Sequence, residues 1–507
     1  MKNSNSTVKG FLDNEKTASG ILTAALIATV IALNVVIFAL ANIFTLSFTA
    51  KEKDQIVLTG NTDSLFEEAI SEGKKVTIFF CFPNESDLES HETGVFVHKT
   101  AKEYESRYDD FIDIEYINLI TGVNSRGEDV SEKIVKWEKD ENGNANYLAK
   151  GSVVFECGDN YKVVTDTISS SAYADFYTLD SSGNAIAYNG EAFMASMINW
   201  VTVDEHKTAY FTVGHSEQLD STFANILVCA GYVLNTVDLK NDEIPADAGL
   251  LIISNPLSDF EKGIGGARKE LERLNDYVKD GGNIYVALDP YVGKMPVLEG
   301  FLAENGIAFS ETDDNGTTVR NIIKDPNNAI TSDGFTLVAD FADNDTSSKI
   351  ADSVNRYSDG SVIIREAAAL KLSGSAVPVL VSTPSSTLEA NGERVDDGGS
   401  YAVAACAKIR GDRNKIASLC VVSSVYISVS DALVTNGYSN ADFMYSLFDN
   451  FYGRGRMPYG CDIVKFDNSM LENLTMGKAK MYTALILAVP VIIAGIGAVI
   501  VIKRKNR

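Results

Sequence analysis

The chain has 507 residues, of which 45% are apolar and 22% are charged. This composition is typical of globular proteins, and it excludes a disordered chain and a small disulfide scaffold. Acidic residues outnumber basic ones by 69 to 44, which gives a net charge of −25. An acidic chain is a poor match for a nucleic acid, so we expect no nucleic-acid partner.

Two uncharged segments near the ends of the chain predict transmembrane helices. They cover residues 21–48 and 481–502, and both exceed the roughly 18 residues that indicate a span. A cleaved signal peptide is the alternative for the first, but its apolar part is too long for one. The tail at 503–507 is basic, which places both termini (1–20 and 503–507) in the cytoplasm. The sequence thus predicts a two-span plasma-membrane protein, in contact with lipid, whose large body is extracytoplasmic.

Residues 51–203 predict a first extracytoplasmic domain. Strands at 75–82 and 111–117 flank a helix at 92–108, and this β-α-β order indicates a parallel pair in a small, thioredoxin-like α/β domain. That family carries a C-x-x-C motif where this chain has only Cys81, so no dithiol redox cycle is expected. A hairpin at 151–165 and a helix at 191–202 complete the domain.

Cysteine and histidine spacing predicts neither a metal site nor a cofactor. The six cysteines fit no zinc pattern, and we interpret Cys229, Cys406 and Cys420, which lie in apolar runs, as small buried hydrophobic residues. His91 and His98 lie seven residues apart, and we assign them to a solvated helix face. The H-E-x-x-H, G-x-S-x-G and Walker A motifs are absent from the sequence. Any ATP hydrolysis linked to this protein would therefore occur on another chain.

Residues 204–455 predict a second domain, in which strands alternate with helices. This alternation indicates a doubly wound, mostly parallel sheet of the flavodoxin or glutamine-amidotransferase type. Residues 311–400 are rich in Asp, Asn, Ser and Gly and predict an insertion, and 456–480 form a linker to the second span. The predicted strands are 208–213, 233–239, 249–254, 283–289, 377–382, 401–409 and 415–423. Helices are predicted at 259–279 and 442–452, and a turn at 214–217 opens another helix that runs to about 230.

The second domain also carries a family resemblance. Its segment Ala209–Glu217 reads Ala-Tyr-Phe-Thr-Val-Gly-His-Ser-Glu and resembles the strand and Gly-His-Gly-Glu turn of gliding-motility-type auxiliary components of ABC transporters, with Ser216 in place of the usual Gly. Further matching pieces follow in family order: Gly231-Tyr232, Val237–Leu239, Ile244-Pro245, Leu250–Pro256, Tyr277–Gly282 and Ala287–Pro290.

The resemblance implies a non-catalytic, membrane-anchored, extracytoplasmic accessory subunit of an ABC-type transport or export system. Its partners would be an ABC-2-type permease and a cytoplasmic ATPase on separate chains. Two alternatives stay open. The chain is a stand-alone surface module that binds glycans or peptides, or it is an ectoenzyme that uses His215 or Asp289.

The ends of the predicted parallel strands nominate a binding site, because ligands of open α/β sheets bind there. The residues concerned are Gly214, His215, Ser216, Glu217, Asn255 and Asp289. A helix N-terminus beside them favours an anion, a small polar ligand or a partner loop. The structural alternative is that Ser216 caps that helix, Glu217 complements its dipole, and Asp289 forms a plain turn. No nucleophile elbow accompanies these residues, so we expect no enzymatic activity.

Overall fold

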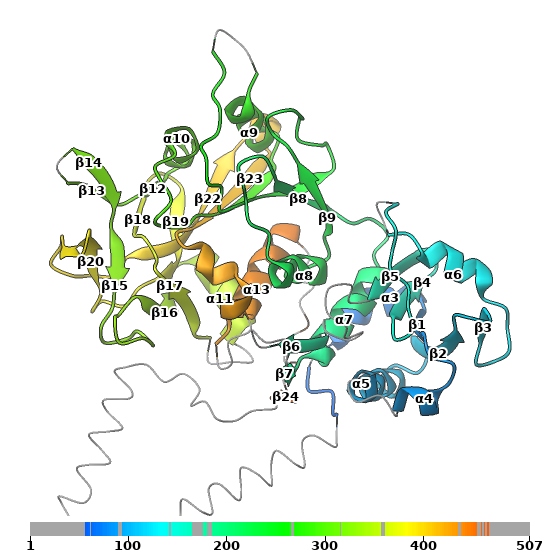
Figure 1. Cartoon of the computed structure of the whole chain (residues 1–507). Helices are drawn as coiled ribbons and strands as arrows, with labels where there is room; N and C mark the ends of the chain where they lie inside the picture. The colour runs from blue at the N-terminus through cyan, green and yellow to red at the C-terminus, as the bar shows by residue number, and fades with distance from the viewer. Residues whose placement is uncertain are drawn as a thin grey trace, which may run out of the picture. The chain divides into compact units, whose positions relative to one another are not determined.

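The structure is a computed structural model that describes residues 56–60, 62–89, 94–140, 143–164, 176–179, 185–264, 268–314, 316–355, 360–433, 438–453, 458, 461 and 464–465. These residues belong to one compact unit. They form a smaller N-terminal α/β domain and a larger C-terminal α/β domain, as Figure 1 shows. None of the six cysteines, all of which are among these residues, forms a disulfide bond.

The N-terminal domain is built on a five-stranded sheet of order β3-β2-β1-β4-β5. Strands β1 and β2 pair in parallel, as predicted, whereas the other pairs are antiparallel. Its elements are α3 (Asp63–Ser71), β1 (Val76–Phe80), α4 (Glu85–Glu89), α5 (Gly94–Arg107), β2 (Ile112–Asn118), β3 (Val123–Asn124), α6 (Ser131–Trp137), β4 (Val153–Cys157), β5 (Asn160–Val164), β6 (Tyr177–Leu179), β7 (Ala185–Tyr188) and α7 (Gly190–Val201).

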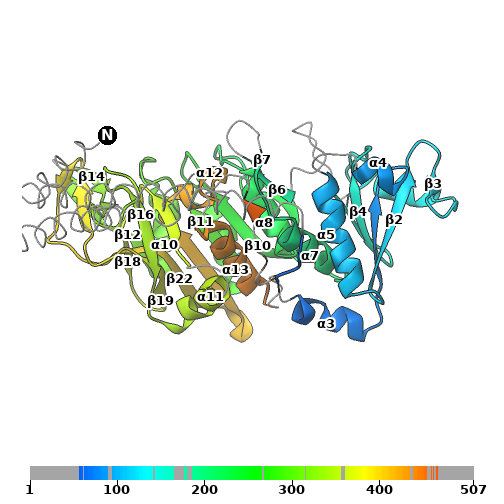
Figure 2. The ribbon, with the colours of Figure 1, turned by 90° about the horizontal axis from the view of Figure 1, so that it is seen from below.

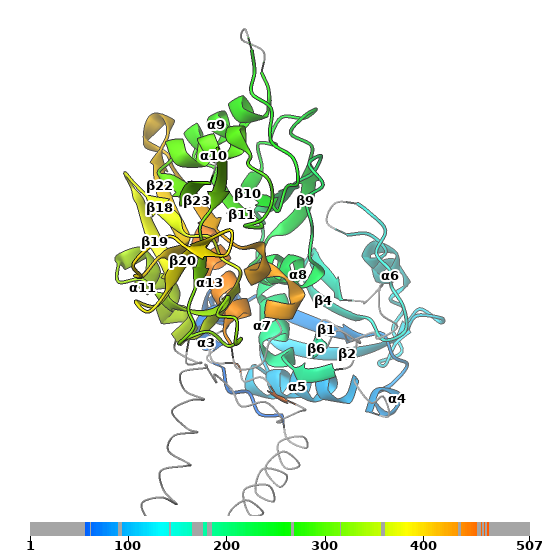
Figure 3. The same cartoon turned by 60° about the vertical axis from the view of Figure 1, so that its left-hand side comes forward.

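Alternating side chains of β1 fill both faces of this sheet. Ile78 and Phe80 pack in one core with residues of α3, α5 and α7. Phe79 points the other way and contacts Trp137 of α6, with ring centroids 4.9 Å apart. Helices α5 and α6 therefore lie on opposite sides of the sheet (Figure 3), and α5 and α7 run side by side (Figure 2).

The C-terminal domain contains a mixed sheet of eleven strands, with the main order β17-β16-β19-β22-β23-β11-β10-β8-β9. The five strands from β9 to β23 in this order are parallel, and the remaining pairs are antiparallel. Its strands are β8 (Thr208–Thr212), β9 (Val233–Val237), β10 (Ala248–Ser254), β11 (Asn283–Ala287), β12 (Ile307–Phe309), β16 (Thr336–Phe341), β17 (Val362–Arg365), β18 (Leu370–Leu372), β19 (Ala376–Val381), β22 (Ala402–Arg410) and β23 (Ile416–Val422).

Helices cover both faces of this sheet (Figure 1). In β10, Leu250 and Ile252 belong to the core that includes α8, α11 and α13, whereas Leu251 and Ile253 face α9 and α10. This burial on both faces explains why the sequence of β10 is continuously apolar. The helices are α8 (Ser221–Cys229), α9 (Glu270–Lys279), α10 (Pro296–Glu304), α11 (Asp345–Asn355), α12 (Ser430–Leu433) and α13 (Asn440–Tyr452).

Three small antiparallel sheets complete the described structure. The last of them joins a C-terminal strand to the N-terminal domain, since β24 pairs with β7. They are β13 (Glu311–Asp314) with β14 (Thr317–Arg320), β15 (Ile322–Lys324) with β20 (Thr387–Ala390) and β21 (Glu393–Arg394), and β6 with β7 and β24 (Val464–Lys465).

The predicted fold class is wrong. The sequence indicated a mostly parallel, flavodoxin-like sheet after a thioredoxin-like domain, but the structure is a mixed α/β fold with many antiparallel pairs. Part of the antiparallel pairing comes from residues 311–400, which the sequence assigned to an insertion. They supply β16, β17, β18 and β19, which extend the main sheet with antiparallel pairs. Strands β16, β17 and β18 are three to six residues long and separated by polar turns, so their pattern does not distinguish them from loops, whereas β19 was predicted at 377–382.

The predicted membrane layout is also contradicted. Within the described part of the chain, none of the helices combines the length and the apolar character that a membrane crossing requires. This finding is against the predicted plasma-membrane localisation with two spans and cytoplasmic termini. The segments 21–48 and 481–502 lie outside the described residues.

Candidate functional site

The six predicted site residues all lie where parallel strands of the main sheet end. They belong to three connections, which we call the strand-end loops: residues 213–220 after β8, 255–264 after β10 and 288–295 after β11. Hydrogen bonds join the first two loops. The Leu257 N–H donates to the His215 carbonyl over 2.8 Å, and the Gln218 N–H donates to the Ser254 carbonyl over 3.1 Å.

A side chain joins the second and third loops. The Asn255 Oδ1 accepts a hydrogen bond from the Asp289 N–H at 3.0 Å. The Asp289 Oδ1 accepts a hydrogen bond from the Tyr291 N–H at 2.8 Å, two residues further along the chain, which is the pattern of an Asx-turn. The Arg320 guanidinium donates to the Asp289 carbonyl at 3.2 Å. Asn255 and Asp289 therefore fix the loop backbone.

The first loop has an unusual backbone. Gly214 has a φ of +112°, and a Cβ at this position would lie 3.0 Å from the Asp238 Oδ1. The Gly214 carbonyl accepts a hydrogen bond of 2.8 Å from the Lys240 Nζ. Ser216 follows with a φ of +60°, in the left-handed region. This backbone turns the His215 side chain into the protein and leaves Ser216 exposed.

His215 is the buried centre of the site, with 1% of its surface exposed. Its ring stacks on Phe260, with centroids 4.3 Å apart and an angle of 8° between the planes. The Nδ1 lies 3.3 Å from the Glu217 Oε1, and the Nε2 lies 3.2 Å from the Glu270 Oε1. The second contact is an ion pair whose atoms are not aligned for a hydrogen bond. We call His215, Glu217 and Glu270 the buried triad.

Both carboxylates of the triad also bind backbone amides. The Glu217 Oε2 accepts from the His215 N–H at 2.7 Å, and the Glu270 Oε2 accepts from the Glu261 N–H at 2.7 Å. Glu270 comes from α9, so the triad connects the loop after β8 to that helix and to the segment before it. Each charged group of the triad thus has partners inside the protein. We therefore interpret the triad as a structural connection between the loop after β8, the loop after β10 and α9.

Electrostatics favours a charged imidazole in the triad. Burial lowers the pKa of His215, but the hydrogen bond with Glu217 and the charge attraction of Glu217 and Glu270 outweigh burial and raise this pKa to about 9. Burial raises the pKa of Glu217, yet the hydrogen bonds from His215 and from backbone amides bring it below its ordinary value. At neutral pH His215 is therefore an imidazolium paired with the Glu217 carboxylate.

The predicted structural roles of Ser216 and Glu217 are wrong. Helix α8 begins at Ser221, and its N-cap is Asp220, whose Oδ1 accepts from the Phe223 N–H at 3.1 Å. Glu217 lies before this helix and binds His215. The loop after β8 is longer than the sequence indicates, because the polar residues before Asp220 form the triad connection.

Two residues of this site were not predicted. Glu270 is fully buried at the start of α9, on the same helix face as Leu274 and Val278. The sequence does carry a signal for Glu270, because it precedes Leu274 and Val278 at the four-residue spacing of one helix face. The prediction of a helix from residue 259 concealed this signal, since it placed the start of the helix too early. Phe260 gives no signal, because its role as a stacking surface depends on tertiary packing.

The strand-end loops expose apolar side chains. Of the twelve large hydrophobic residues that are exposed among the described ones, five lie on these loops. Leu219 is 57% exposed and Ile264 is 88% exposed. Each of the three loops carries at least one of these side chains. The five are Val213, Leu219, Leu257, Ile264 and Tyr291.

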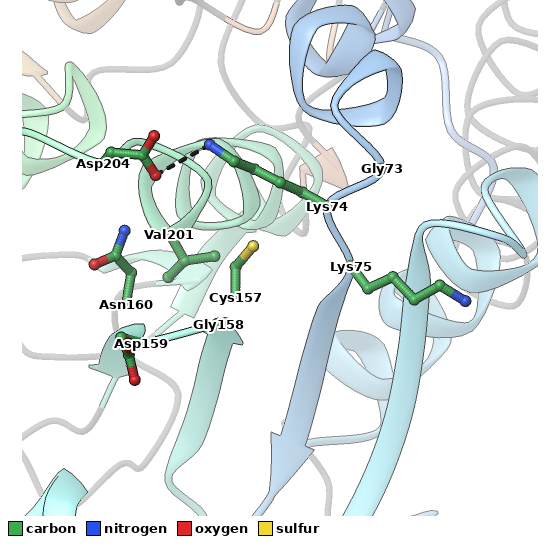
Figure 4. Close-up of a pocket in the computed structure, with 9 residues that line it drawn as sticks. All are labelled: Gly73, Lys74, Lys75, Cys157, Gly158, Asp159, Asn160, Val201 and Asp204. Carbon is green, nitrogen blue, oxygen red and sulfur yellow. Dashed lines mark hydrogen bonds and ion pairs between the residues drawn. The ribbon is translucent and has the colours of Figure 1, made fainter.

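A separate open cavity of about 530 Å³ lies in the N-terminal domain. Its walls come from the start of β1, the β4–β5 turn and the end of α7. Figure 4 shows Lys74 reaching across it to Asp204, at 3.1 Å, while the Lys75 side chain points away. The cavity contains none of the predicted site residues. It is lined by Gly73, Lys74, Lys75, Cys157, Gly158, Asp159, Asn160, Val201 and Asp204.

Comparisons with known proteins leave the function open. The sequence matches no family model and no curated protein. The mmIFT52 N-terminal domain is 17% identical, with a TM-score of 0.36, and the match covers 49% of this chain and 99% of that one. A putative ThuA-like protein from Bacteroides uniformis ATCC 8492 is 11% identical, with a TM-score of 0.25, over 48% and 89% of the two chains. PurLQS from Thermotoga maritima is 12% identical, with a TM-score of 0.26, over 49% and 100%. Likenesses this low carry no argument about activity or partners.

Proposed function

We propose that this protein is a non-catalytic accessory subunit of an ABC-type transport complex. In this proposal it works with a permease and an ATPase on separate chains and binds one of them through the strand-end loops. The resemblance of residues 209–290 to auxiliary components of ABC transporters supports the class of complex. The surface of the loops supports the mode of action.

The exposed apolar residues of the strand-end loops carry the proposal. Leu219, Leu257 and Tyr291 come from three different loops and are each more than half exposed. Removing such side chains from water favours association by about 25 cal/mol per Å² of apolar surface. A protein partner with a complementary apolar face would provide that burial, whereas a small polar ligand would not.

The buried triad supports the same proposal. His215 and Glu217 are the titratable side chains expected at the surface of this site, but they are directed inward and bind each other. The strand-end loops thus expose apolar side chains to a partner, while the buried triad holds the loop backbone in place. This arrangement suits a docking surface, because little conformational entropy is lost when a rigid loop binds.

Affinity purification from the native host tests the proposal. A tagged full-length chain, extracted in mild detergent, should recover a multi-span permease and a Walker-type ATPase in a fixed ratio. The triple variant Leu219→Ser, Leu257→Ser, Tyr291→Ser should lose at least about 90% of both, since the apolar contacts are removed. Ile120→Ser is the matched control, because Ile120 is 96% exposed but lies in the N-terminal domain.

Two outcomes would contradict the proposal. One is recovery of the chain alone in several detergents. The other is a triple variant that folds normally and keeps its partners as well as the control does.

The N-terminal cavity favours a second candidate function, which is the binding of a small glycan or peptide. Its volume of about 530 Å³ lies within the range of ligand sites, and its lining includes Asn160 and the Lys74–Asp204 ion pair. Glycan-array and peptide-library binding to the full chain would test this function. If this function is correct, the wild type binds a ligand, and Asn160→Ala folds normally but loses that binding.

A further inference from the structure

A second cluster of titratable side chains lies between α4 and α5 of the N-terminal domain. Glu85 and Glu89 are the first and last residues of α4, four positions apart, so they lie on one face of that helix. His98 comes from α5. One carboxylate oxygen from each glutamate and one imidazole nitrogen all lie within 4.8 Å of one another.

The imidazole distinguishes this cluster from an ordinary group of surface acids. The sequence indicated a solvated His98, but the side chain is buried with 2% exposure. Phe80 packs edge-on against its ring, with centroids 5.6 Å apart. The Nε2 lies 2.6 Å from the Tyr116 hydroxyl and 3.5 Å from the Glu85 Oε1. The ring is thus held by the core, with its Nε2 on the side of the two glutamates.

The charge around the cluster is incompletely balanced. The Lys102 Nζ is 4.0 Å from Glu85 but only 3.2 Å from the Glu105 Oε2, which is its closer partner. Glu85 and Glu89 are both exposed to solvent, so an ion can reach them.

We propose that Glu85, Glu89 and His98 bind one divalent transition-metal ion of the Zn²⁺ class. Two carboxylates and an imidazole are ligands of zinc, whereas calcium and magnesium sites use oxygen alone. Three protein ligands leave a fourth position for water. Because the ligands come from two helices, the ion would hold α4 against α5. This site is separate from the strand-end loops and does not depend on the proposed function.

Tyr116 has a defined part in this proposal. Its hydroxyl is hydrogen-bonded to the His98 Nε2, so a metal that binds this nitrogen must displace the hydroxyl. Tyr116→Phe keeps the ring and removes this hydroxyl. We therefore expect tighter zinc binding in this variant, by about threefold or more.

Zinc titration of the full-length chain tests the proposal. After chelator treatment and dialysis, calorimetry should show one Zn²⁺ per chain, and the thermal midpoint should rise with zinc concentration. Glu85→Gln and Glu89→Gln should each weaken binding about tenfold or more, because each removes a charged ligand. Glu103→Gln, which changes an exposed glutamate of α5 outside the cluster, should leave the affinity unchanged.

X-ray absorption of the zinc-loaded protein gives a second readout that does not depend on variant stability. The expected spectrum has one imidazole among oxygen ligands. Equal affinities in the wild type, Glu85→Gln and Glu89→Gln would overturn the proposal, since the ion would then bind elsewhere. Absence of a one-to-one site, or a spectrum without imidazole, would also overturn it.

Discussion

His215 shows how one side chain can organise several loops. It lies on the loop after β8, stacks on Phe260 of the loop after β10, and pairs with Glu270 of α9. Moving a charge from water into a protein interior is costly unless partners surround it. Glu217 and Glu270 supply those partners, so the burial of each charged group depends on the other two. The arrangement makes His215 a positioning residue for the strand-end loops.

Removing the imidazole should therefore destabilise the protein strongly. His215→Gln leaves Glu217 and Glu270 buried without a cation, and breaking a buried ion pair in this way costs about 3–5 kcal/mol. Thermal and urea unfolding of the wild type and the variant measure this loss. Glu304→Gln, at an exposed position of α10, is the control and should change stability by less than about 0.5 kcal/mol. A loss below about 1 kcal/mol in His215→Gln would contradict the account.

The same triad predicts a pH dependence. The folded-state pKa of His215 is about 9, against an ordinary value of 6.5, so the folded protein holds the proton more tightly than the unfolded chain does. The stabilisation from the charged imidazole is thus complete below pH 6.5 and is lost as the pH rises through about 9. The difference in thermal midpoint between the wild type and His215→Gln should shrink from about pH 7 to about pH 10. A difference that stays constant or grows over this range would show that the imidazole is neutral in the folded protein.

At the scale of elements, the sequence predicts those segments whose burial produces a regular pattern. Strands β8, β10 and β11 are apolar because both faces are covered, and each was located within two residues. The C-terminal limit of α9 was also predicted, because Gly281 follows it with a φ of +87°.

The elements that were missed lack such a pattern. Helix α9 was expected from residue 259 but begins at Glu270, since a loop precedes it that carries Phe260. Strands β16, β17 and β18 fall in the segment that was assigned to an insertion, because β17 and β18 are too short to show alternation. Strands β19 and β22 were predicted, at 377–382 and 401–409. The sequence also predicts that Gly214, His215, Asn255 and Asp289 lie at one edge of the sheet, because each follows a parallel strand. The sequence does not predict that the His215 side chain points inward. That direction depends on the positive φ of Gly214 and on Glu270, which comes from a helix far along the chain.

The start of α8 gives a prediction at this scale. The Asp220 side chain accepts from the Phe223 N–H, and its Oδ2 accepts from the Ser430 N–H at 2.9 Å, so it caps α8 and ties it to α12. Asp220→Ala should lower the free energy of unfolding by about 1–2 kcal/mol, measured by urea unfolding. Asp220→Asn should recover most of this loss. Ser216→Ala, at the position that the sequence wrongly assigned as the cap, should cost less than about 0.5 kcal/mol. Equal losses at Asp220 and Ser216 would contradict this assignment of the cap.

At the scale of the molecule, the two domains present different chemistry. The C-terminal domain gathers exposed apolar residues on the strand-end loops, behind which the buried triad lies. The N-terminal domain carries the polar cavity and the Glu85–Glu89–His98 cluster. An accessory subunit that binds its partner with one domain and a metal ion or small ligand with the other is consistent with both sets of observations.

Site-specific photo-crosslinking measures the central claim most directly. A photoreactive amino acid at Leu219 or Leu257 in the full-length chain, irradiated in native-host cells, should yield adducts whose peptides belong to a permease or an ATPase. The same group at Ile120, which is more exposed but lies in the N-terminal domain, should yield few or none. The account predicts adducts at both loop positions with one partner. Adducts at Ile120 equal to those at Leu219, or no adduct at either loop position in folded protein, would contradict it.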